Sequence, residues 1–191
     1  MKTLLKNLTD SAVIVAGVAA SLLYGESFAA TQRTLSPNST GSVTISATKA
    51  ARARVSGLTD LTLTSWVEND GNVTLTTDAC VYSSRALGAY TVKATGSGIA
   101  NAFTIANGPN TLPYNVTWNS GGVGALTNTG TALTSGVTSP GLTRAARDSA
   151  TCTGATPGPN ARLIVGLLAA NLANAADGAY TGTITLLVTP N

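Results

Sequence analysis

The sequence of 191 residues contains no histidine, and charged residues make up only 10% of it. The absence of imidazole excludes Ser-His-Asp triads, Cys-His pairs and metal sites that need a histidine ligand. Paired carboxylates for acid–base catalysis are not expected either, because the only close acidic pair of the exported part, Glu68 and Asp70, lies in an expected turn. Asp78 lacks the surrounding pattern of a calcium loop. We therefore expect no catalytic residues, no metal site and no cofactor, and we expect that the protein is not an enzyme.

Basic residues are scattered along the chain rather than clustered. There are 11 Lys and Arg against 8 Asp and Glu, and no basic run is interleaved with aromatic residues. This distribution argues against a nucleic-acid partner. The scarcity of charge also removes the residues that usually prevent exposed strand edges from associating. A polymer subunit tolerates such edges better than a monomer does.

The amino end has the pattern of a secretory signal peptide. Lys2 and Lys6 precede an apolar stretch at 11–24, which is shorter than the roughly 20 residues of a membrane-spanning helix. Ser27-Phe-Ala29 then fits the rule for a cleavage site between small residues. We expect cleavage before Ala30, so that residues 30–191 are exported.

Cys80 and Cys152 are the only cysteines, and both lie in the expected exported part. A pair of cysteines in an exported protein is most simply one disulfide. A bridge that closes so long a loop would stabilise the fold by roughly 4 kcal/mol in the chain-entropy model. The alternative of a redox or nucleophilic thiol lacks a Cys-x-x-Cys motif and a histidine partner.

Threonine, serine, asparagine, glycine and alanine dominate the chain, which is typical of β-strands and turns. Apolar and polar residues alternate in short runs separated by turn signals. This pattern predicts an all-β fold, an antiparallel β-sandwich. Strands are expected at 42–48, 58–66, 72–82, 89–95, 101–106, 111–118 and 162–168, with a weaker one near 132–133 and a last one near the carboxyl end.

Glycine and proline add local detail to these expected strands. Gly96-Ser-Gly98 predicts a hairpin between the two strands on either side of it. Pro113 marks its strand as an edge strand or as the site of a bulge. Residues 49–55 fit either a strand or a helix, and residues 169–176 fit a helix that follows the strand at 162–168. Periodicity alone does not decide between these alternatives.

Two segments have the pattern of strands that could pair with another chain. The last expected strand pairs inside its own domain or offers its edge to another chain, and it places on one face Tyr180, Gly182, Ile184, Leu186 and Val188. Near the amino end, Val43, Ile45 and Ala47 alternate with polar residues after a flexible polar lead. Such a segment fits a strand that completes the sheet of another subunit. It fits the first strand of its own domain equally well, and the pattern leaves both roles open.

Four motifs together resemble bacterial chaperone–usher pilins, nearest to the colonisation-factor (alternate) and spore-coat-U-like (archaic) classes. Gly41–Thr48 is similar to an amino-terminal donor strand, and Leu112–Asn119 is similar to the mid-chain strand of these pilins. Gly178–Thr189 resembles their closing strand. Asp78–Tyr82 with Cys152 resembles the framework of related secreted proteins. The resemblance covers most of residues 41–189.

This resemblance implies an immunoglobulin-like sandwich that lacks one strand. A periplasmic chaperone would fill the gap first, and the donor strand of the next subunit would then replace the chaperone. In this chain the inserted side chains would be Val43, Ile45 and Ala47. The domain organisation would then be a signal peptide at 1–29, a flexible lead with the donor strand at 30–48, and the pilin domain at 49–191.

The function implied is that of a structural subunit of a surface fimbria, exported through the periplasm and supporting adhesion or biofilm formation. Its partners would be identical or related pilin subunits, a periplasmic chaperone and an outer-membrane usher. The long Gly- and Thr-rich segment at 120–159 departs from a compact pilin and leaves room for a tip adhesin or a self-complemented relative. The main alternative is a monomeric secreted module that binds a glycan or matrix through surface that includes Trp66 and Trp118. A surface-layer or spore-coat protein is a third reading.

Overall fold

The computed structural model describes residues 35–153 and 158–191, and the expected signal peptide and its cleavage site lie outside them. The chain divides into two units at Thr48–Lys49. In the first unit, residues 43–48 are exposed and belong to no strand, although a strand was expected there. A strand needs a hydrogen-bonded neighbour, and this segment has no ladder partner in the described part of the chain. The second unit, residues 49–191, holds the sandwich.

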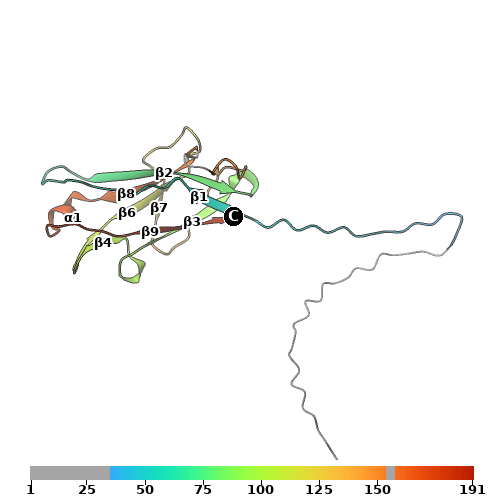
Figure 1. Cartoon of the computed structure of the whole chain (residues 1–191), viewed down its shortest axis with the longest axis horizontal. Coiled ribbons are helices and arrows are strands. Elements are labelled where there is room, and N and C mark those ends of the chain that lie inside the picture. The colour runs from blue at the N-terminus through green and yellow to red at the C-terminus, as the bar shows by residue number, and fades with distance from the viewer. Residues whose placement is uncertain (1–34, 154–157) are drawn as a thin grey trace, which may run out of the picture. The chain divides into compact units, whose positions relative to one another are not determined.

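One layer of the sandwich is a five-stranded antiparallel sheet (Figure 1). Its strand order is β1-β2-β8-β6-β7, and every neighbouring pair is antiparallel. The long strand β2 and the apolar strand β8 form its centre, because both contain β-branched and other apolar residues at alternating positions. The strands are β1 (Ala53–Ser56), β2 (Val73–Ser83), β6 (Asn115–Asn119), β7 (Thr131–Leu133) and β8 (Ala161–Leu167).

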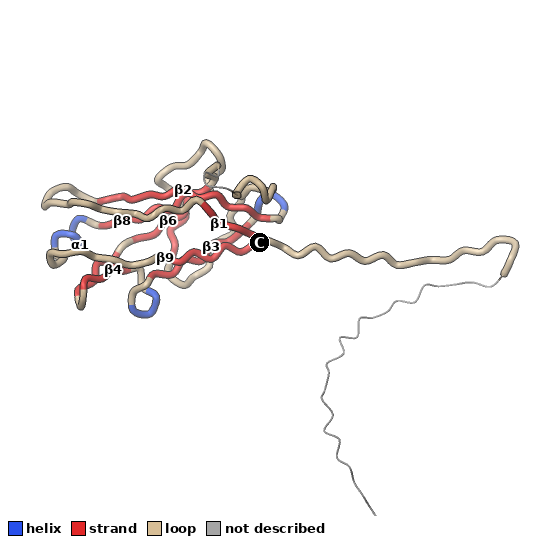
Figure 2. The backbone as a smooth tube through the Cα atoms, viewed as in Figure 1, coloured by secondary structure: helices blue, strands red, loops and turns tan. Residues whose placement is uncertain are grey.

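The other layer is assembled from two strand pairs and single bridges. β3 (Tyr90–Gly96) pairs with β9 (Ile184–Pro190), and β4 (Thr104–Asn107) pairs with β5 (Asn110–Pro113). An antiparallel bridge between Ala106 and Thr181 joins the β4–β5 pair to the segment that leads into β9. Figure 2 shows that helical turns occupy only short connections in the described chain, namely η1 (Ala86–Gly88), η2 (Ile99–Asn101) and α1 (Ala169–Ala173).

The core lies between the two layers. Trp118 of β6 is fully buried, and its Nε1 donates a hydrogen bond to Tyr90 Oη of β3 at 3.0 Å. This bond joins the layers, and its desolvated setting makes it stronger than it would be in water. Apolar side chains from both sheets surround the pair, among them Val81, Val92, Ala94, Val116 and Leu163. The expected antiparallel β-sandwich is confirmed.

A disulfide joins Cys80 in β2 to Cys152, with the two Cα atoms 5.4 Å apart. The loop that contains Cys152 also contacts β1. Ser56 Oγ donates to the Cys152 carbonyl at 2.9 Å, and Arg54 Nη1 donates to the Ser149 carbonyl at 3.0 Å. The first strand of the sandwich is therefore attached to the disulfide loop as well as to β2.

Several expected strands are confirmed, but the hairpin across residues 96–98 is wrong. The strands expected at 72–82 and 162–168 are β2 and β8. β3 and β4 do not pair with each other, because β3 pairs with β9 and β4 with β5. A Cβ atom on Gly96 would lie 2.1 Å from the Ala102 carbonyl oxygen. This glycine allows a close backbone crossing rather than a tight hairpin turn.

The single strand expected at 111–118 is two strands. β5 ends at Pro113 and β6 begins at Asn115, and the two belong to different sheets. Tyr114 lies between them, and its backbone N–H donates to the Phe103 carbonyl at 3.0 Å. The change of sheet follows Pro113, which has no N–H to donate to a ladder.

Candidate strand-binding groove

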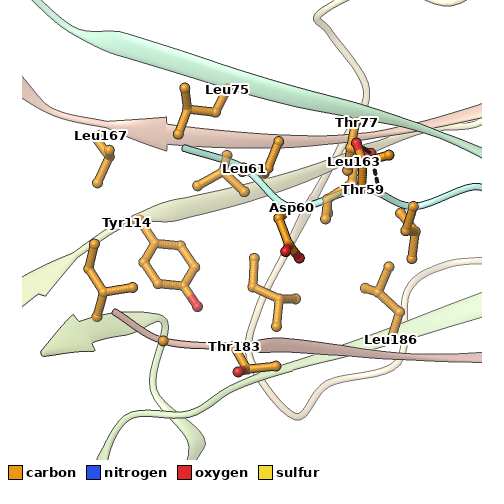
Figure 3. A pocket seen from close by; sticks show the side chains of 15 residues that line it. Thr59, Asp60, Leu61, Leu75, Thr77, Tyr114, Leu163, Leu167, Thr183 and Leu186 are labelled. Atoms are coloured by element: carbon orange, nitrogen blue, oxygen red, sulfur yellow. Dashed lines mark hydrogen bonds between the residues drawn. The ribbon is translucent and has the colours of Figure 1, made fainter. Parts of the chain in front are cut away.

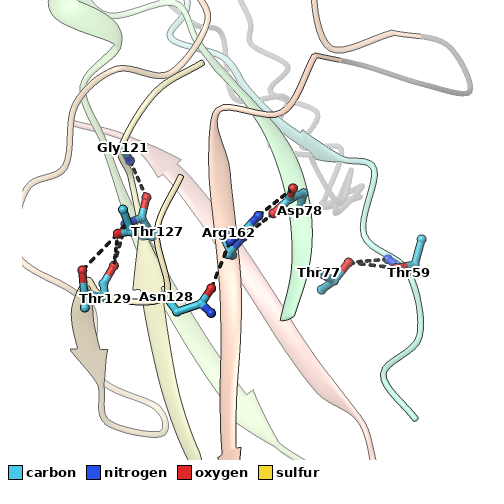
Figure 4. Close-up of polar contacts among 9 residues, drawn as sticks. Thr59, Thr77, Asp78, Gly121, Thr127, Asn128, Thr129 and Arg162 are labelled. Atoms are coloured by element: carbon cyan, nitrogen blue, oxygen red, sulfur yellow. Dashed lines mark hydrogen bonds and ion pairs between the residues drawn. The ribbon is translucent and has the colours of Figure 1, made fainter. Parts of the chain in front are cut away.

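A strand expected at 58–66 is absent, and this segment forms one wall of an open groove. In the described chain no ladder pairs residues 57–66 with a neighbour. A side chain holds the segment beside β2 instead: Thr59 N donates to Thr77 Oγ1 at 2.9 Å, and the two hydroxyl oxygens are 3.0 Å apart (Figure 4). Leu61 and Leu63 are half-buried and alternate with exposed residues, as in a strand. Its side chains alternate in burial as those of a strand do, but its backbone has no ladder partner in the described chain.

The second wall is β9 with the residues just before it. One edge of β9 pairs with β3 from Ile184 to Pro190, and no ladder in the described chain uses the other edge. Ile184, Leu186 and Val188 are half-buried, whereas the residues between them are exposed. The expectation that these three residues share one face of the last strand is confirmed. The side chains of these three residues point toward the core. The edge of β9 that does not pair with β3 stays open.

Two adjoining cavities lie between these walls. The first, of about 450 Å³, lies between Leu58–Leu61 and Gly182–Leu186 (Figure 3). The second, of about 730 Å³, lies between Leu61–Trp66 and Ala173–Gly182. They are continuous, and we call them together the groove, because both are lined by Leu61, Leu75, Ile105, Leu167 and Gly182.

The floor of the groove is the interior of the sandwich. In the first cavity it consists of side chains from β2, β8 and β4, including Leu75, Leu163, Val165 and Ile105. Many of the apolar residues that are only partly buried against the core line this groove, namely Leu61, Leu63, Leu75, Ile105, Leu172, Ala175, Tyr180, Ile184 and Leu186. The hydrophobic core is thus covered on most sides and open along one line between two unpaired strand edges.

Tyr114 adds a polar atom to this apolar floor. The residue is 6% exposed, and its hydroxyl has no hydrogen-bond partner among the described residues. Figure 3 shows the hydroxyl pointing into the pocket. Burial raises the pKa of the Tyr114 phenol, so the group stays neutral and able to donate. A buried hydroxyl without a partner costs roughly 1–3 kcal/mol.

Charged residues on the groove are all acidic. Asp60 lines the first cavity, and Glu68 and Asp177 line the second, whereas no Lys or Arg is among the described residues that line either. None of the three makes an ion pair, since the ion pair in the described chain joins Arg162 to Asp78 at 2.6 Å, in the five-stranded sheet (Figure 4). The groove therefore combines an apolar floor with negative charge along its rim.

The residues predicted to form a donor strand lie outside the sandwich unit. Val43 is 73% exposed and Ile45 is 88% exposed, and Ala47 is exposed as well. The resemblance implied a missing strand, but the position of the groove was missed because residues 58–66 were expected to be a strand. The available signal was the spacing of Leu61 and Leu63, which is imperfect around Asp60.

The other residues that the sequence singles out lie in the core, in a turn or on the lining of the groove. Trp118 is buried in the core, and half-buried Trp66 donates from Nε1 to the Gly71 carbonyl at 3.1 Å. Glu68 lies in the expected turn, which is present. Within residues 35–153 and 158–191, no cluster of acidic and cysteine side chains could hold a metal ion. Across the same residues, no helix has the length and apolar character needed to cross a membrane.

No protein-family model and no curated protein matches the chain. A solved structure that resembles it comes from a study of a chaperone–tip adhesin complex described as vital for the synergistic activation of CFA/I fimbriae biogenesis. The TM-score is 0.48 and the sequence identity is 15%. The match covers 73% of this chain and 41% of the solved chain, so it spans less than half the length of the latter.

Proposed function

We propose that the protein is a structural subunit of a surface fimbria that assembles by donor-strand complementation and supports adhesion or biofilm formation. A strand from a neighbouring subunit lies in the groove, between residues 57–66 and β9, and hydrogen-bonds to their open edges. The observation that carries this proposal is the coincidence of two unpaired edges with an opening in the hydrophobic core. Main-chain hydrogen bonds would supply affinity, and alternate side chains would fill the apolar floor.

The donor strand that we propose is residues 42–48 of another copy. Its apolar residues Val43, Ile45 and Ala47 alternate with Ser and Thr, so they face the floor together when the segment is extended. Val43 and Ile45 are exposed in the single chain, and burying such side chains stabilises a complex by about 1.5–3 kcal/mol each. No ladder among the described residues uses the backbone of residues 43–48, which leaves its hydrogen-bonding groups available.

The groove also explains which other partners such a subunit needs. An open apolar groove between free strand edges aggregates unless something covers it during export. We propose that a periplasmic chaperone does so first and that an outer-membrane usher directs the exchange for a donor strand. The signal peptide expected at residues 1–29 and the disulfide between Cys80 and Cys152 fit a route through an oxidising compartment to the cell surface.

Self-complementation tests the proposal. A copy of residues 41–48 is joined after Asn191 by a flexible linker, and the original lead at 30–48 is removed. We expect this variant to be monomeric and to unfold about 10 °C or more above the variant that lacks both segments, because it closes the core. The matched control carries Val43→Asp and Ile45→Asp in the appended copy, and it should gain little.

The opposite result would contradict the proposal. If residues 49–191 alone are a stable monomer, and the appended strand leaves their thermal unfolding unchanged, then the sandwich needs no donor. That outcome would favour the alternative of a monomeric secreted binding module.

A further inference from the structure

We infer that charge fixes the direction of the entering strand, so that Lys49 of one copy lies against Glu68 and Asp177 of the next. This inference rests on the proposed function, since it concerns a strand from a second copy in the same groove. It adds a partner residue and an orientation that the groove alone does not specify.

The two walls of the groove run in opposite directions. Leu58–Leu61 faces Gly182–Leu186 in the first cavity, and Leu61–Trp66 faces Ala173–Gly182 in the second. Residue numbers therefore rise along one wall as they fall along the other. A strand between them is antiparallel to β9 if Val43 lies at the Leu58 end, and parallel to β9 if Val43 lies at the Trp66 end.

The groove differs in polarity between its ends. At the Leu58 end the lining includes Leu163, Val165 and Leu186, which suit the side chains of Val43 and Ile45. At the Trp66 end it also includes Leu63, Leu112 and Leu172, but these lie beside Ser65, several threonines and alanines, and the carboxylates of Glu68 and Asp177. Both ends accept aliphatic side chains, but the Trp66 end carries two carboxylates, which suit a cation.

The entering segment has the matching order. Lys49 follows Ala47 at the same spacing of two residues, so it lies on the face that carries Val43 and Ile45. From residue 43 to residue 49 an extended chain covers roughly 20 Å, and from residue 58 to residue 65 roughly 23 Å. With Val43 at the Leu58 end, Lys49 therefore reaches the acidic end.

The reverse direction matches less well. It would place Lys49 near Asp60, a single carboxylate in the more apolar cavity, and Val43 in the cavity that carries two carboxylates. It would also make the ladder with β9 parallel, and a parallel ladder is slightly less stable per residue. Charge, polarity and ladder type all favour the antiparallel direction.

The hydroxyl of Tyr114 indicates independently that the groove takes a strand rather than a purely apolar ligand. It is more than nine-tenths buried, points into the first cavity and has no partner among the described residues. The backbone carbonyls of an entering strand are acceptors for such a donor. The groove thus presents a hydrogen-bond donor on its floor and carboxylates at one end.

Zero-length crosslinking tests the direction directly. Oligomers or fibres of residues 30–191, assembled from a mixture of isotope-labelled and unlabelled chains, are treated with a carbodiimide, which condenses a lysine and a contacting carboxylate into an amide. We expect mass spectrometry to find amides between Lys49 and Glu68 or Asp177 that join labelled to unlabelled chains. An amide between Lys49 and Asp60, or none from Lys49, would overturn the inference and leave the proposed function standing.

Charge exchange tests the cause. Lys49→Glu should slow assembly about tenfold at low salt, and adding Glu68→Lys and Asp177→Lys should restore the rate. The difference should vanish near 1 M salt, where the screening length is about 3 Å. Lys93→Glu on β3 is the matched control and should assemble normally. Equal rates for Lys49→Glu and Lys93→Glu would overturn the inference, and a wild-type chain that never assembles would overturn the proposed function itself.

Discussion

Trp118 Nε1 donates a hydrogen bond to Tyr90 Oη at 3.0 Å, and both side chains are almost completely buried between the two sheets. Among the described residues the indole N–H of Trp118 has no other hydrogen-bond acceptor, so it needs the tyrosine hydroxyl. The pair therefore connects β6 to β3 across the middle of the sandwich.

Tyr90→Phe removes this acceptor and leaves the Trp118 N–H buried without a partner. We expect the free energy of unfolding to fall by about 1–3 kcal/mol. Urea denaturation monitored by tryptophan fluorescence measures the change. Tyr82→Phe is the control, because Tyr82 is only half-buried and its hydroxyl can therefore be solvated. Equal effects of the two substitutions would contradict a special role for the Trp118–Tyr90 bond.

Alkaline pH should destabilise the fold through the same tyrosine. Burial raises the pKa of Tyr90 above 10.0, although its hydrogen bond from Trp118 opposes the shift, and burial raises the pKa of Tyr114 too. Above pH 10 the unfolded chain loses these protons before the folded chain does. Stability is therefore fully present below about pH 10 and falls as the pH rises, by up to about 1.4 kcal/mol per pH unit for each group.

Urea denaturation between pH 7 and pH 11.5 measures this slope. The double variant Tyr90→Phe and Tyr114→Phe should lose most of it. A slope that is unchanged in the double variant would show that other groups cause the alkaline loss of stability.

Tyr114→Phe alone should act in the opposite direction from Tyr90→Phe. It removes a buried hydroxyl that has no partner in the described chain, so the isolated subunit should become more stable by about 1 kcal/mol. The ring contact with Phe103, with centroids 5.6 Å apart, is retained. Thermal unfolding of the two proteins under the same conditions gives the comparison. A loss of stability would mean that the hydroxyl already has a partner in the free subunit.

Asn160 is expected to be one of the most sensitive polar residues. It is 3% exposed, its Oδ1 accepts from Val81 N at 2.8 Å, and its Nδ2 donates to the Val81 carbonyl at 2.8 Å. The side chain thus takes the place of a strand residue beside β2. Asn160→Ala leaves the buried Val81 N–H without its acceptor, whereas the Val81 carbonyl still accepts from the Ala146 N–H at 2.7 Å, so the substitution should cost about 1–3 kcal/mol. Asn110→Ala, at an exposed position in β5, is the control and should cost less than 1 kcal/mol. A loss for Asn160→Ala no larger than that of the control would show that the side chain does not support β2.

The central strands could be predicted from sequence, because their own residues determine them. In β2 and β8 apolar side chains recur at every second position, and the face of the strand that carries them packs against the core. The change of sheet at Tyr114 was only partly visible, since Pro113 indicated an edge or a bulge but not which sheets it separates. The sequence therefore indicates a break in the strand at Pro113, but it does not indicate which strands β5 and β6 pair with.

The resemblance implied a gap in the sandwich, but the two walls of the groove could not be located from the sequence, for a related reason. Alternation at Leu61 and Leu63 looks the same whether or not a neighbouring strand is present. Pairing depends on distant residues, so the absence of a ladder along residues 57–66 and along one edge of β9 is a property of the folded chain. The false hairpin at Gly96 has the same cause, because β3 finds its partner in β9, almost a hundred positions away.

The attachment of β1 to the disulfide loop has a mechanical consequence. In a fibre of the proposed kind, tension from one subunit to the next enters the sandwich at residues 49–56, where the lead joins β1. Four ladder positions hold β1 to β2, and Ser56 and Arg54 hold it to the loop that Cys152 anchors covalently to Cys80. A pulling force would therefore meet a covalent crosslink close to its point of entry, and reduction of that crosslink should lower the force at which a stretched fibre yields.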